Sequence, residues 1–470
     1  MVVLMLLLSC TKNFLDVDNN AALFRQNYVK DLKSLKEFLN GIYSKNAEFL
    51  EFYTSSAYPE IVSDNLKPAD LSGRLANHYL WNQSASPEES ERPAGSVGNR
   101  TMNGFWLSGY RLIRACDFVI EEIGKYRNEN PVLADEMVGQ AYAMRAYLHF
   151  KMVNIFAQTY TFTSDGSHPG IPYIMTSDIS KSYSRQSVAE VYEFMITDIK
   201  AALQLLPITT TDTRFMNRLA AQALLSRIYL FKEDYAKARE VALEVTAKVP
   251  LLSISKGYPN DLFKLKNDGN TETLFQISPI PAFAIFLGRY LGTQAFVGTS
   301  DLASILREDP NDIRSSWISQ SGTKWIISKF PAGAAPEIVP ALSPSTASYY
   351  IPALRTSELY LNIAESAMKL GDENMARAYL NSVRKRANPN AREINESGIA
   401  LMDLIVRERR KELCIEGLRM GDLQRWKLGV QRGDTADDAA KNLPFGSDKS
   451  IAPIPPQDVT TMGIPQNMGY

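Results

Sequence analysis

Two segments of this chain, residues 216–250 and 356–388, repeat one design in which two amphipathic helices follow each other about a short polar turn. Within each helix, apolar residues recur at i, i+3, i+4 and i+7, which is the period of one helix face. The four stripes are Ala221, Leu224, Leu225 and Ile228; Ala238, Val241, Ala242 and Val245; Tyr360, Ile363, Ala364 and Ala367; and Ala376, Tyr379, Leu380 and Val383. A helix pair of this kind cannot bury its apolar face alone, so the pattern predicts a mostly α-helical fold with stacked pairs.

The repeating unit is about 34 residues long and has small alanines at the helix crossings, which is the tetratricopeptide (TPR) design. Further helical periodicity covers residues 32–50, 104–126, 137–156 and 187–206. Two irregular regions, 59–102 and 256–352, interrupt the helices, and the second holds short strand-like pieces between Gly and Pro breaks. We expect one compact unit made of parts 10–210 and 211–470, each with one variable loop region. Long loops inside a compact unit are often functional.

Composition excludes several classes of function. The chain of 470 residues is 45% hydrophobic and 22% charged, as in ordinary folded proteins, and its net charge of −1 offers no field for a nucleic acid. The three cysteines and three histidines form no metal-binding spacing, and GxSxG, P-loop, GxGxxG and zinc motifs are absent. Asp268–Asn270 resembles a hairpin turn more than a calcium loop, and Cys116 and Cys414 lie on expected helices as buried thiols. We expect no enzyme, cofactor or metal.

The first ten residues, MVVLMLLLSC, form an apolar run too short to span a bilayer. The run has the character of the apolar part of a signal peptide without its basic start. We therefore expect residues 1–9 to be a truncated signal peptide. Because Leu7–Cys10 resembles the lipobox of bacterial lipoproteins, we expect Cys10 to carry a lipid anchor, against the plainer alternative of a merely hydrophobic start.

The densest charge lies in Arg407–Trp426, which admits three interpretations: a nucleic-acid arm, a catalytic carboxylate cluster, or a structural helix. Helical phase favours the third, because the apolar stripe through Leu401 and Ile405 continues through Glu408 and Glu412. Carboxylates on an inward face must be paired, since an unpaired buried charge is costly. We expect a buried Glu–Arg network, with Arg145 as a possible member.

The aromatic residues divide into two groups. Trp106 and Trp426 lie on helices and are expected in the packing. Trp81, Trp317 and Trp325 fall in the irregular regions, where a flat ring could stack on a sugar while amides bind its hydroxyls. The candidate ligand-binding residues are Asn77, Tyr79, Trp81, Asn82, Tyr290, Trp317 and Trp325. Residues 77–83 have strand-like spacing, and the alternative for each aromatic is simple loop packing.

Seven segments, in this order and spacing, resemble the SusD/RagB family of outer-membrane nutrient-binding lipoproteins. They are LSC…NFLDV, GQAYAMRAYLHFKMVNIFA, SRQSVAEVYEFMITDIKAALQLLP, RLAAQALLSRIYLFKEDYAKA, LRTSELYLNIAESAMKLGD, RERRKELCIEGLRMGDLQRW and IAPIPPQD…PQNMGY. The LSC segment resembles a lipobox, and Asp312–Arg314 resembles the D-x-R loop of the family, which we interpret as structural pairing.

The resemblance implies a helical TPR-like scaffold with variable ligand-binding loops, held on the outer membrane by a lipid. It implies capture of oligosaccharides, or of peptides in some members, for a SusC-like TonB-dependent transporter, without catalysis. Two other possibilities stay open: a glycan-degrading enzyme, which would need a carboxylate pair in a cleft, and a TPR protein–protein scaffold.

Overall fold

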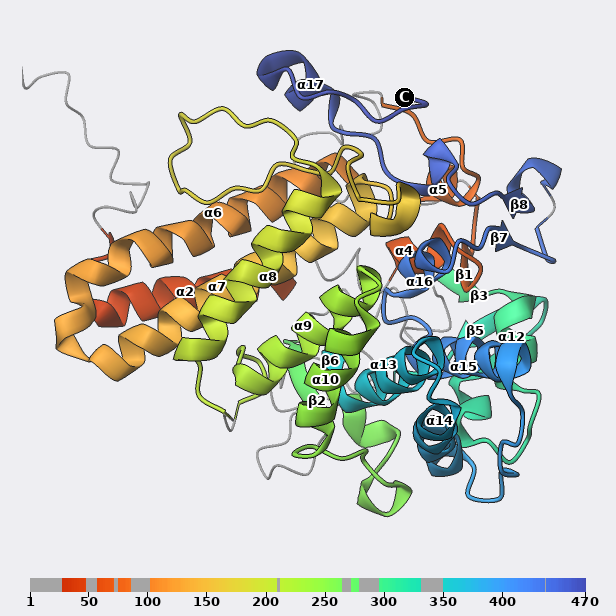
Figure 1. Ribbon diagram of the computed structural model, residues 1–470. Coiled ribbons are helices and arrows are strands. Elements are labelled where there is room, and N and C mark those ends of the chain that lie inside the picture. The colour runs from red at the N-terminus through yellow and green to blue at the C-terminus, as the bar shows by residue number, and fades with distance from the viewer. Residues whose placement is uncertain are drawn as a thin grey trace, which may run out of the picture.

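A computed structural model describes most of the chain (Figure 1). The described residues are 28–47, 57–71, 75–85, 102–208, 212–263, 272–278, 296–330, 350–435 and 437–470. Cys10, Asp268–Asn270 and Tyr290 lie outside them, so the predictions on these residues stay predictions. No helix of the described residues combines the length and apolar character that crossing a membrane requires.

Long helices form the N-terminal part, as the periodicity predicts. They are α2 (Leu32–Asn46), α6 (Met102–Tyr126), α7 (Pro131–Phe156) and α8 (Val188–Leu205). Helix α7 begins with Pro131 after the Asn130 cap, and α8 begins with a capping box of Ser187 and Glu190. Helix α7 packs between α6 and α8, so that its sides are covered by neighbouring helices (Figure 1).

The two helix pairs that the periodicity predicts are confirmed. The first is α9 (Arg218–Phe231) with α10 (Tyr235–Thr246), and the second is α13 (Thr356–Lys369) with α14 (Glu373–Ala387). Positive φ angles at Glu233 (61°) and Gly371 (82°) make the turns. Helix α10 packs against α13, so the pairs stack in space although a long stretch of chain separates them.

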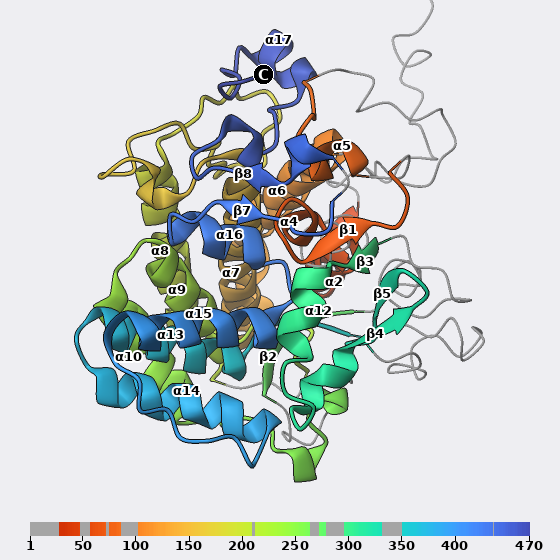
Figure 2. The same cartoon turned by 90° about the vertical axis from the view of Figure 1, so that its right-hand side faces the viewer.

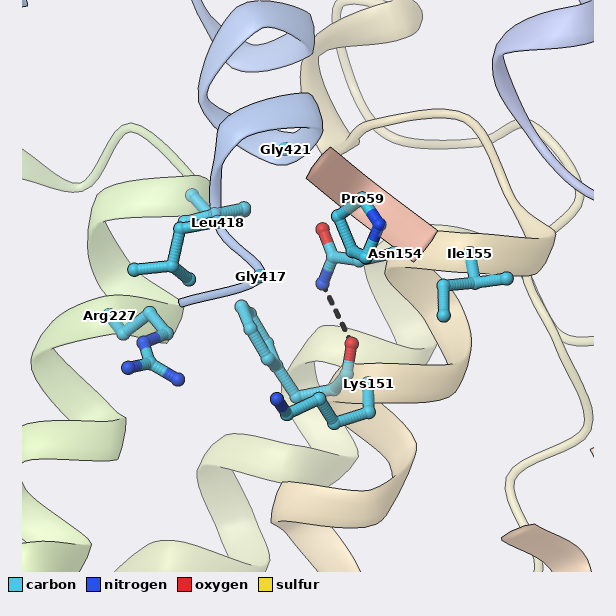
Figure 3. A pocket seen from close by; sticks show the side chains of 10 residues that line it. Pro59, Lys151, Asn154, Ile155, Arg227, Gly417, Leu418 and Gly421 are labelled. Atoms are coloured by element: carbon cyan, nitrogen blue, oxygen red, sulfur yellow. Dashed lines mark hydrogen bonds between the residues drawn. The ribbon is translucent and has the colours of Figure 1, made fainter. Parts of the chain in front are cut away.

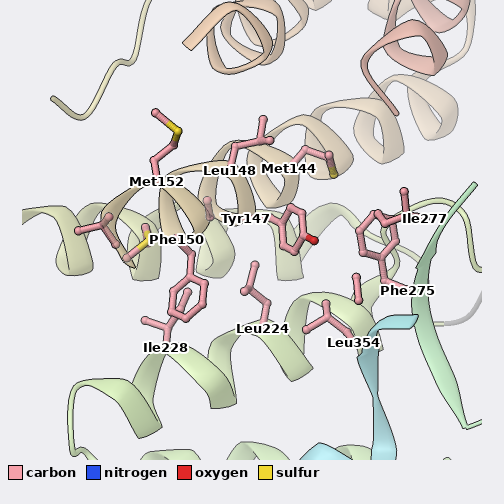
Figure 4. Close-up of a cluster of buried hydrophobic side chains, with 14 of the residues drawn as sticks. Met144, Tyr147, Leu148, Phe150, Met152, Leu224, Ile228, Phe275, Ile277 and Leu354 are labelled. Carbon is pink, nitrogen blue, oxygen red and sulfur yellow. The ribbon is translucent and has the colours of Figure 1, made fainter. Parts of the chain in front are cut away.

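The main core lies where α7 meets α9 and a two-stranded sheet (Figure 4). Its labelled members from α7 are Met144, Tyr147, Leu148, Phe150 and Met152; those from other elements are Leu224, Ile228, Phe275, Ile277 and Leu354. The sheet pairs β2 (Thr273–Ile277) with β6 (Ile351–Arg355) antiparallel. A helix that is buried around most of its circumference belongs at the centre of a fold, which is where α7 lies.

A four-stranded antiparallel sheet joins the two irregular regions. Its order is β1 (Leu66–Pro68), β3 (Phe296–Gly298), β5 (Lys324–Ile327) and β4 (Ile318–Ser321). Strand β1 comes from the first irregular region and the other three come from the second, beside α12 (Ser300–Leu306) (Figure 2). The regions that were expected to carry function therefore meet in one sheet.

Helix α15 (Gly398–Leu413) follows the second helix pair. The other α-helices and strands are short: α4 (Tyr58–Ile61), α5 (Ala76–Tyr79), α16 (Arg419–Arg425), α17 (Pro456–Met462) and a sheet of β7 (Val430–Gln431) with β8 (Asn442–Leu443). The charged stretch is thus two helices, α15 and α16, because Ile415 and Gly417 adopt positive φ angles between them. The expected strand at residues 77–83 is wrong: α5 and a left-handed Trp81 (φ 55°) occupy it.

Candidate functional site

Trp325 lies at the open end of one face of the four-stranded sheet. Its backbone pairs with Gly298 on β3 and with Gln320 on β4, so the three positions share a face. Further along this face, the cross-strand pair Ile318 and Ile327 is buried in the core. A Cβ at Gly298 would stand 2.6 Å from Ile318 Cδ1, so glycine lets these side chains pack over the strand. The face is closed by core packing at one end, and Trp325 is only partly buried at the other.

An arginine and an amide flank Trp325. Helix α12 is held against the core by Leu302 and Leu306, and it ends at Arg307, whose guanidinium carbon lies 5.5 Å from the Trp325 ring centroid. Arg307 and Gln320 are both exposed. An aromatic ring beside a guanidinium and a carboxamide offers an apolar surface with hydrogen-bonding groups at its rim, the combination that a sugar ring requires.

The two predicted asparagines come together beside the edge strand β1. Both side chains are exposed, and the backbone N–H of Asn82 donates to the carbonyl of Asn77 at 3.0 Å. Helix α5 contacts β1, which is two strands away from β5 in the sheet. Two strand spacings place β1 about 10 Å from β5, so the asparagines and Trp325 are not neighbours in the sheet. Both groups remain candidates for ligand contact.

Tyr79 and Trp81 are buried, contrary to the expectation of an open aromatic surface. The Arg432 guanidinium lies 4.1 Å from the Tyr79 ring centroid and 4.0 Å from that of Trp81. Trp81 Nε1 also donates to the carbonyl of Val62 at 3.1 Å. Arg432 donates to the backbone carbonyls of Ser63, Ile61, Tyr79 and Ala440. In this structure the Tyr79 and Trp81 rings pack against Arg432 and are not exposed to solvent.

Trp317 is buried as well, with 2% of its surface exposed. It ends a short 3-10 turn (Ile313–Trp317), and Lys329 Nζ lies 4.5 Å from its ring centroid. Of the three loop tryptophans, Trp325 alone keeps part of its ring accessible. Trp106 is buried as predicted, while Trp426 is half-buried and donates from Nε1 to Glu365 at 2.8 Å.

The predicted Glu–Arg network is confirmed, and Glu412 stands at its centre. Arg314 Nη1 contacts Glu412 Oε2 at 2.9 Å, while Arg355 Nη1 and Arg386 Nη2 both contact Oε1 at 2.6 Å. Arg314 Nη2 lies 2.7 Å from Glu408 Oε1. Burial alone would raise the pKa of Glu412, but the three guanidinium groups hold it well below its usual range.

The partners of Glu412 come from distant elements and not from the charged stretch itself. Including Arg145 in this network was wrong: it pairs at 2.6 Å with Asp117 and at 2.6 Å with Asp198, between α6, α7 and α8. The expected structural pairing of Asp312 with Arg314 is confirmed, with Oδ2 and Nη2 2.8 Å apart.

The charged stretch Arg407–Trp426 also holds in place the β4–β5 hairpin, on which Trp325 lies. Arg314 precedes β4 and pairs with Glu408 and Glu412, while Lys329 follows β5 and pairs with Glu416 at 2.6 Å. Both ends of the hairpin are therefore tied to buried carboxylates. The stretch contributes to the candidate surface by positioning it.

Comparison with known proteins decides the family. Residues 13–230 match a family described as starch-binding and associating with the outer membrane, and residues 299–470 match the SusD family. The chain belongs to the SusD family.

Relatives of similar length support this assignment. SusD-like protein P2 of Formosa agariphila is 25% identical over 527 aligned positions, covering 100% of this chain and 98% of the relative. SusD-like protein P38 of the same species is 21% identical, and the alignment covers 76% of this chain and 79% of the relative. A solved SusD superfamily protein of Bacteroides thetaiotaomicron has a TM-score of 0.79 at 25% identity, covering 93% of this chain and 100% of that one.

Figure 3 shows a cavity between α7, α9 and α16 in this SusD family member. Its volume is about 30 Å³, the share of one water molecule in the liquid. Pro59, Lys151, Asn154 and Gly417 contribute to the lining, and Asn154 Nδ2 donates to the carbonyl of Phe150 at 2.7 Å. The space is far below the several hundred Å³ of an ordinary ligand site, so it is not the candidate site.

Cys116 and Cys414 are both buried, as expected. Burial raises the pKa of the Cys414 thiol to about 11 and also raises that of Cys116, which leaves little thiolate at neutral pH. Within the described ranges, no three His, Cys, Asp or Glu residues come close enough to hold a metal ion.

Three residues of this SusD family structure were missed from sequence. Gln320 could have been found, because the two-residue turn at Gly322 implies the pairing of Gln320 with Trp325. Arg307 and Arg432 carry no comparable signal, since their aromatic partners are brought to them by the tertiary fold.

Proposed function

We propose that this protein binds oligosaccharides at the bacterial cell surface and passes them to a SusC-like, TonB-dependent transporter, without catalysing a reaction. The observation that carries the proposal is the half-buried Trp325 between Arg307 and Gln320, on the sheet where both variable regions meet. The family description as starch-binding and outer-membrane-associated supports it. An anchor at lipidated Cys10 would keep the protein on the membrane surface.

Rigidity of the surface supports a binding role. The strands carrying Trp325 are tied at both ends to the Glu412 and Glu416 carboxylates. A preformed platform loses little conformational entropy when a ligand binds, so modest contacts suffice for useful affinity. We expect micromolar dissociation constants, equivalent to about −8 kcal/mol.

The test is a screen of the protein lacking residues 1–10 against an oligosaccharide panel, with a peptide library as the alternative. Calorimetric titration of the tightest binder then compares wild type with Trp325→Ala. We expect at least about tenfold weaker binding, because a stacked aromatic contributes on the order of 1.4 kcal/mol or more. Phe162→Ala is the matched control, since Phe162 is an exposed aromatic (41%) in a different element (Tyr160–Phe162).

Two results would count against the proposal. One is binding of peptides with no binding of any glycan. The other is glycan binding that Trp325→Ala leaves unchanged, which would move the site elsewhere. Co-purification of a TonB-dependent transporter with the full chain from outer membranes tests the proposed partner separately.

A further inference from the structure

Arg307 differs from Arg314, Arg355 and Arg386 because it has no carboxylate partner among the described residues. Arg314, Arg355 and Arg386 each contact at least two carboxylates. Among the described residues, the Arg307 side chain contacts the Trp325 ring. Its guanidinium is exposed at the end of α12, and its hydrogen-bond donors reach no acidic side chain of the described residues.

The acidic residues next to Arg307 in sequence are occupied by other partners. Glu308 pairs with Arg407 and, at 2.5 Å, with Lys411. Asp309 Oδ2 accepts from Asn388 Nδ2 at 2.7 Å. Lys324, at the tip of the same hairpin as Trp325, is exposed and makes no ion pair with any described residue. Within the described part of the chain, Arg307 at the Trp325 ring and Lys324 at the hairpin tip are therefore cations without a carboxylate partner, in a protein whose net charge is −1.

We propose that the Trp325 surface recognises an acidic sugar, whose ring stacks on Trp325 while its anionic group binds the Arg307 guanidinium. The inference rests on the proposed function and adds the class of ligand. A guanidinium binds a carboxylate or sulfate through two parallel hydrogen bonds, which a neutral sugar cannot match. Contact with Trp325 restricts Arg307 before binding, which lowers the entropy cost of ordering it. Gln320 lies beside the Trp325 ring, where its carboxamide would bind a neighbouring hydroxyl of the sugar.

The experiment uses three probes with the protein lacking residues 1–10. Hexagalacturonate carries carboxylates, its fully methyl-esterified form has the same backbone without charge, and a sulfated galactan hexasaccharide carries sulfates. Each is titrated by calorimetry at low and moderate salt into wild type, Arg307→Gln and Arg111→Gln. Arg111 is the matched control, because it is an exposed arginine on α6 that makes no ion pair with any described residue.

We expect at least one charged probe to bind wild type about tenfold more tightly than the esterified one, with affinity falling as salt rises. Arg307→Gln should remove this preference and leave neutral binding within about twofold, while Arg111→Gln should change neither. The two charged probes distinguish a carboxylate from a sulfate site.

Equal binding of charged and neutral glycans, or a preference that survives Arg307→Gln, would overturn the inference and leave the proposed function standing. If neither these probes nor any panel oligosaccharide binds, the proposed function fails and the inference fails with it.

Discussion

Replacing Glu412 by Gln removes the carboxylate on which Arg314, Arg355 and Arg386 converge, while the size of the side chain is kept. Breaking a buried ion pair in this way costs about 3–5 kcal/mol, because the partner charges remain buried without compensation. With an unfolding entropy of about 2.1 cal/mol/K per residue, a chain of 470 residues changes its Tm by about 1 °C per kcal/mol. The expected decrease in Tm is therefore about 3–5 °C, measured by circular dichroism at pH 7.

The pKa of Glu412 is lowered in the folded state, so its stabilisation is complete above the ordinary carboxyl pKa and is lost as the pH falls. The deficit of Glu412→Gln should accordingly shrink in acid. Glu393→Gln is the control, because Glu393 pairs with Lys385 at the exposed surface and should change Tm very little. Glycan affinity should persist below the melting temperature, because Glu408 and Glu416 still hold the two ends of the hairpin. An unchanged Tm, or a large loss of affinity at unchanged Tm, would refute the structural role of Glu412.

Three further predictions concern other parts of the chain. Burial raises the pKa of Asp117 to about 7 against the lowering effect of Arg145. The folded state therefore holds its proton more tightly, and stability falls as the pH rises from about 4 to about 7. Asp117→Asn should remove most of this pH dependence, measured as the urea concentration at the unfolding midpoint at each pH. An unchanged pH dependence would contradict the raised pKa of Asp117. Arg432→Gln should expose Trp81 and shift tryptophan emission to longer wavelength; an unaltered spectrum would argue against the stacked arrangement. Cys10→Ala should abolish labelling with radioactive palmitate and release the protein from membranes, and labelling that persists would place the anchor elsewhere.

Most of the helical fold could be predicted from local periodicity in the sequence. The stripes of α9, α10, α13 and α14 depend on residues three and four apart, and such spacing is visible in the sequence. The inward phase of Glu408 and Glu412 was visible for the same reason. The identity of their partners was not, because Arg314, Arg355 and Arg386 lie on elements that only the tertiary fold brings to α15.

The candidate site was less predictable than the fold. Tyr79 and Trp81 have the composition of a sugar-binding loop, yet Arg432, some 350 residues away in sequence, covers their rings. Lys329 lies over Trp317 in the same manner. Whether a loop aromatic is open or covered depends on such distant side chains. Trp325 remains a candidate for ligand contact because it lies at the partly exposed end of one face of the four-stranded sheet.

A co-crystal structure with the tightest-binding oligosaccharide would show whether Trp325 is the binding surface. We expect a sugar ring parallel to the Trp325 indole, with its polar groups within hydrogen-bonding distance of Arg307 and Gln320. A ligand bound in the groove of the TPR-like helices, or anywhere that leaves Trp325 uncontacted, would contradict it.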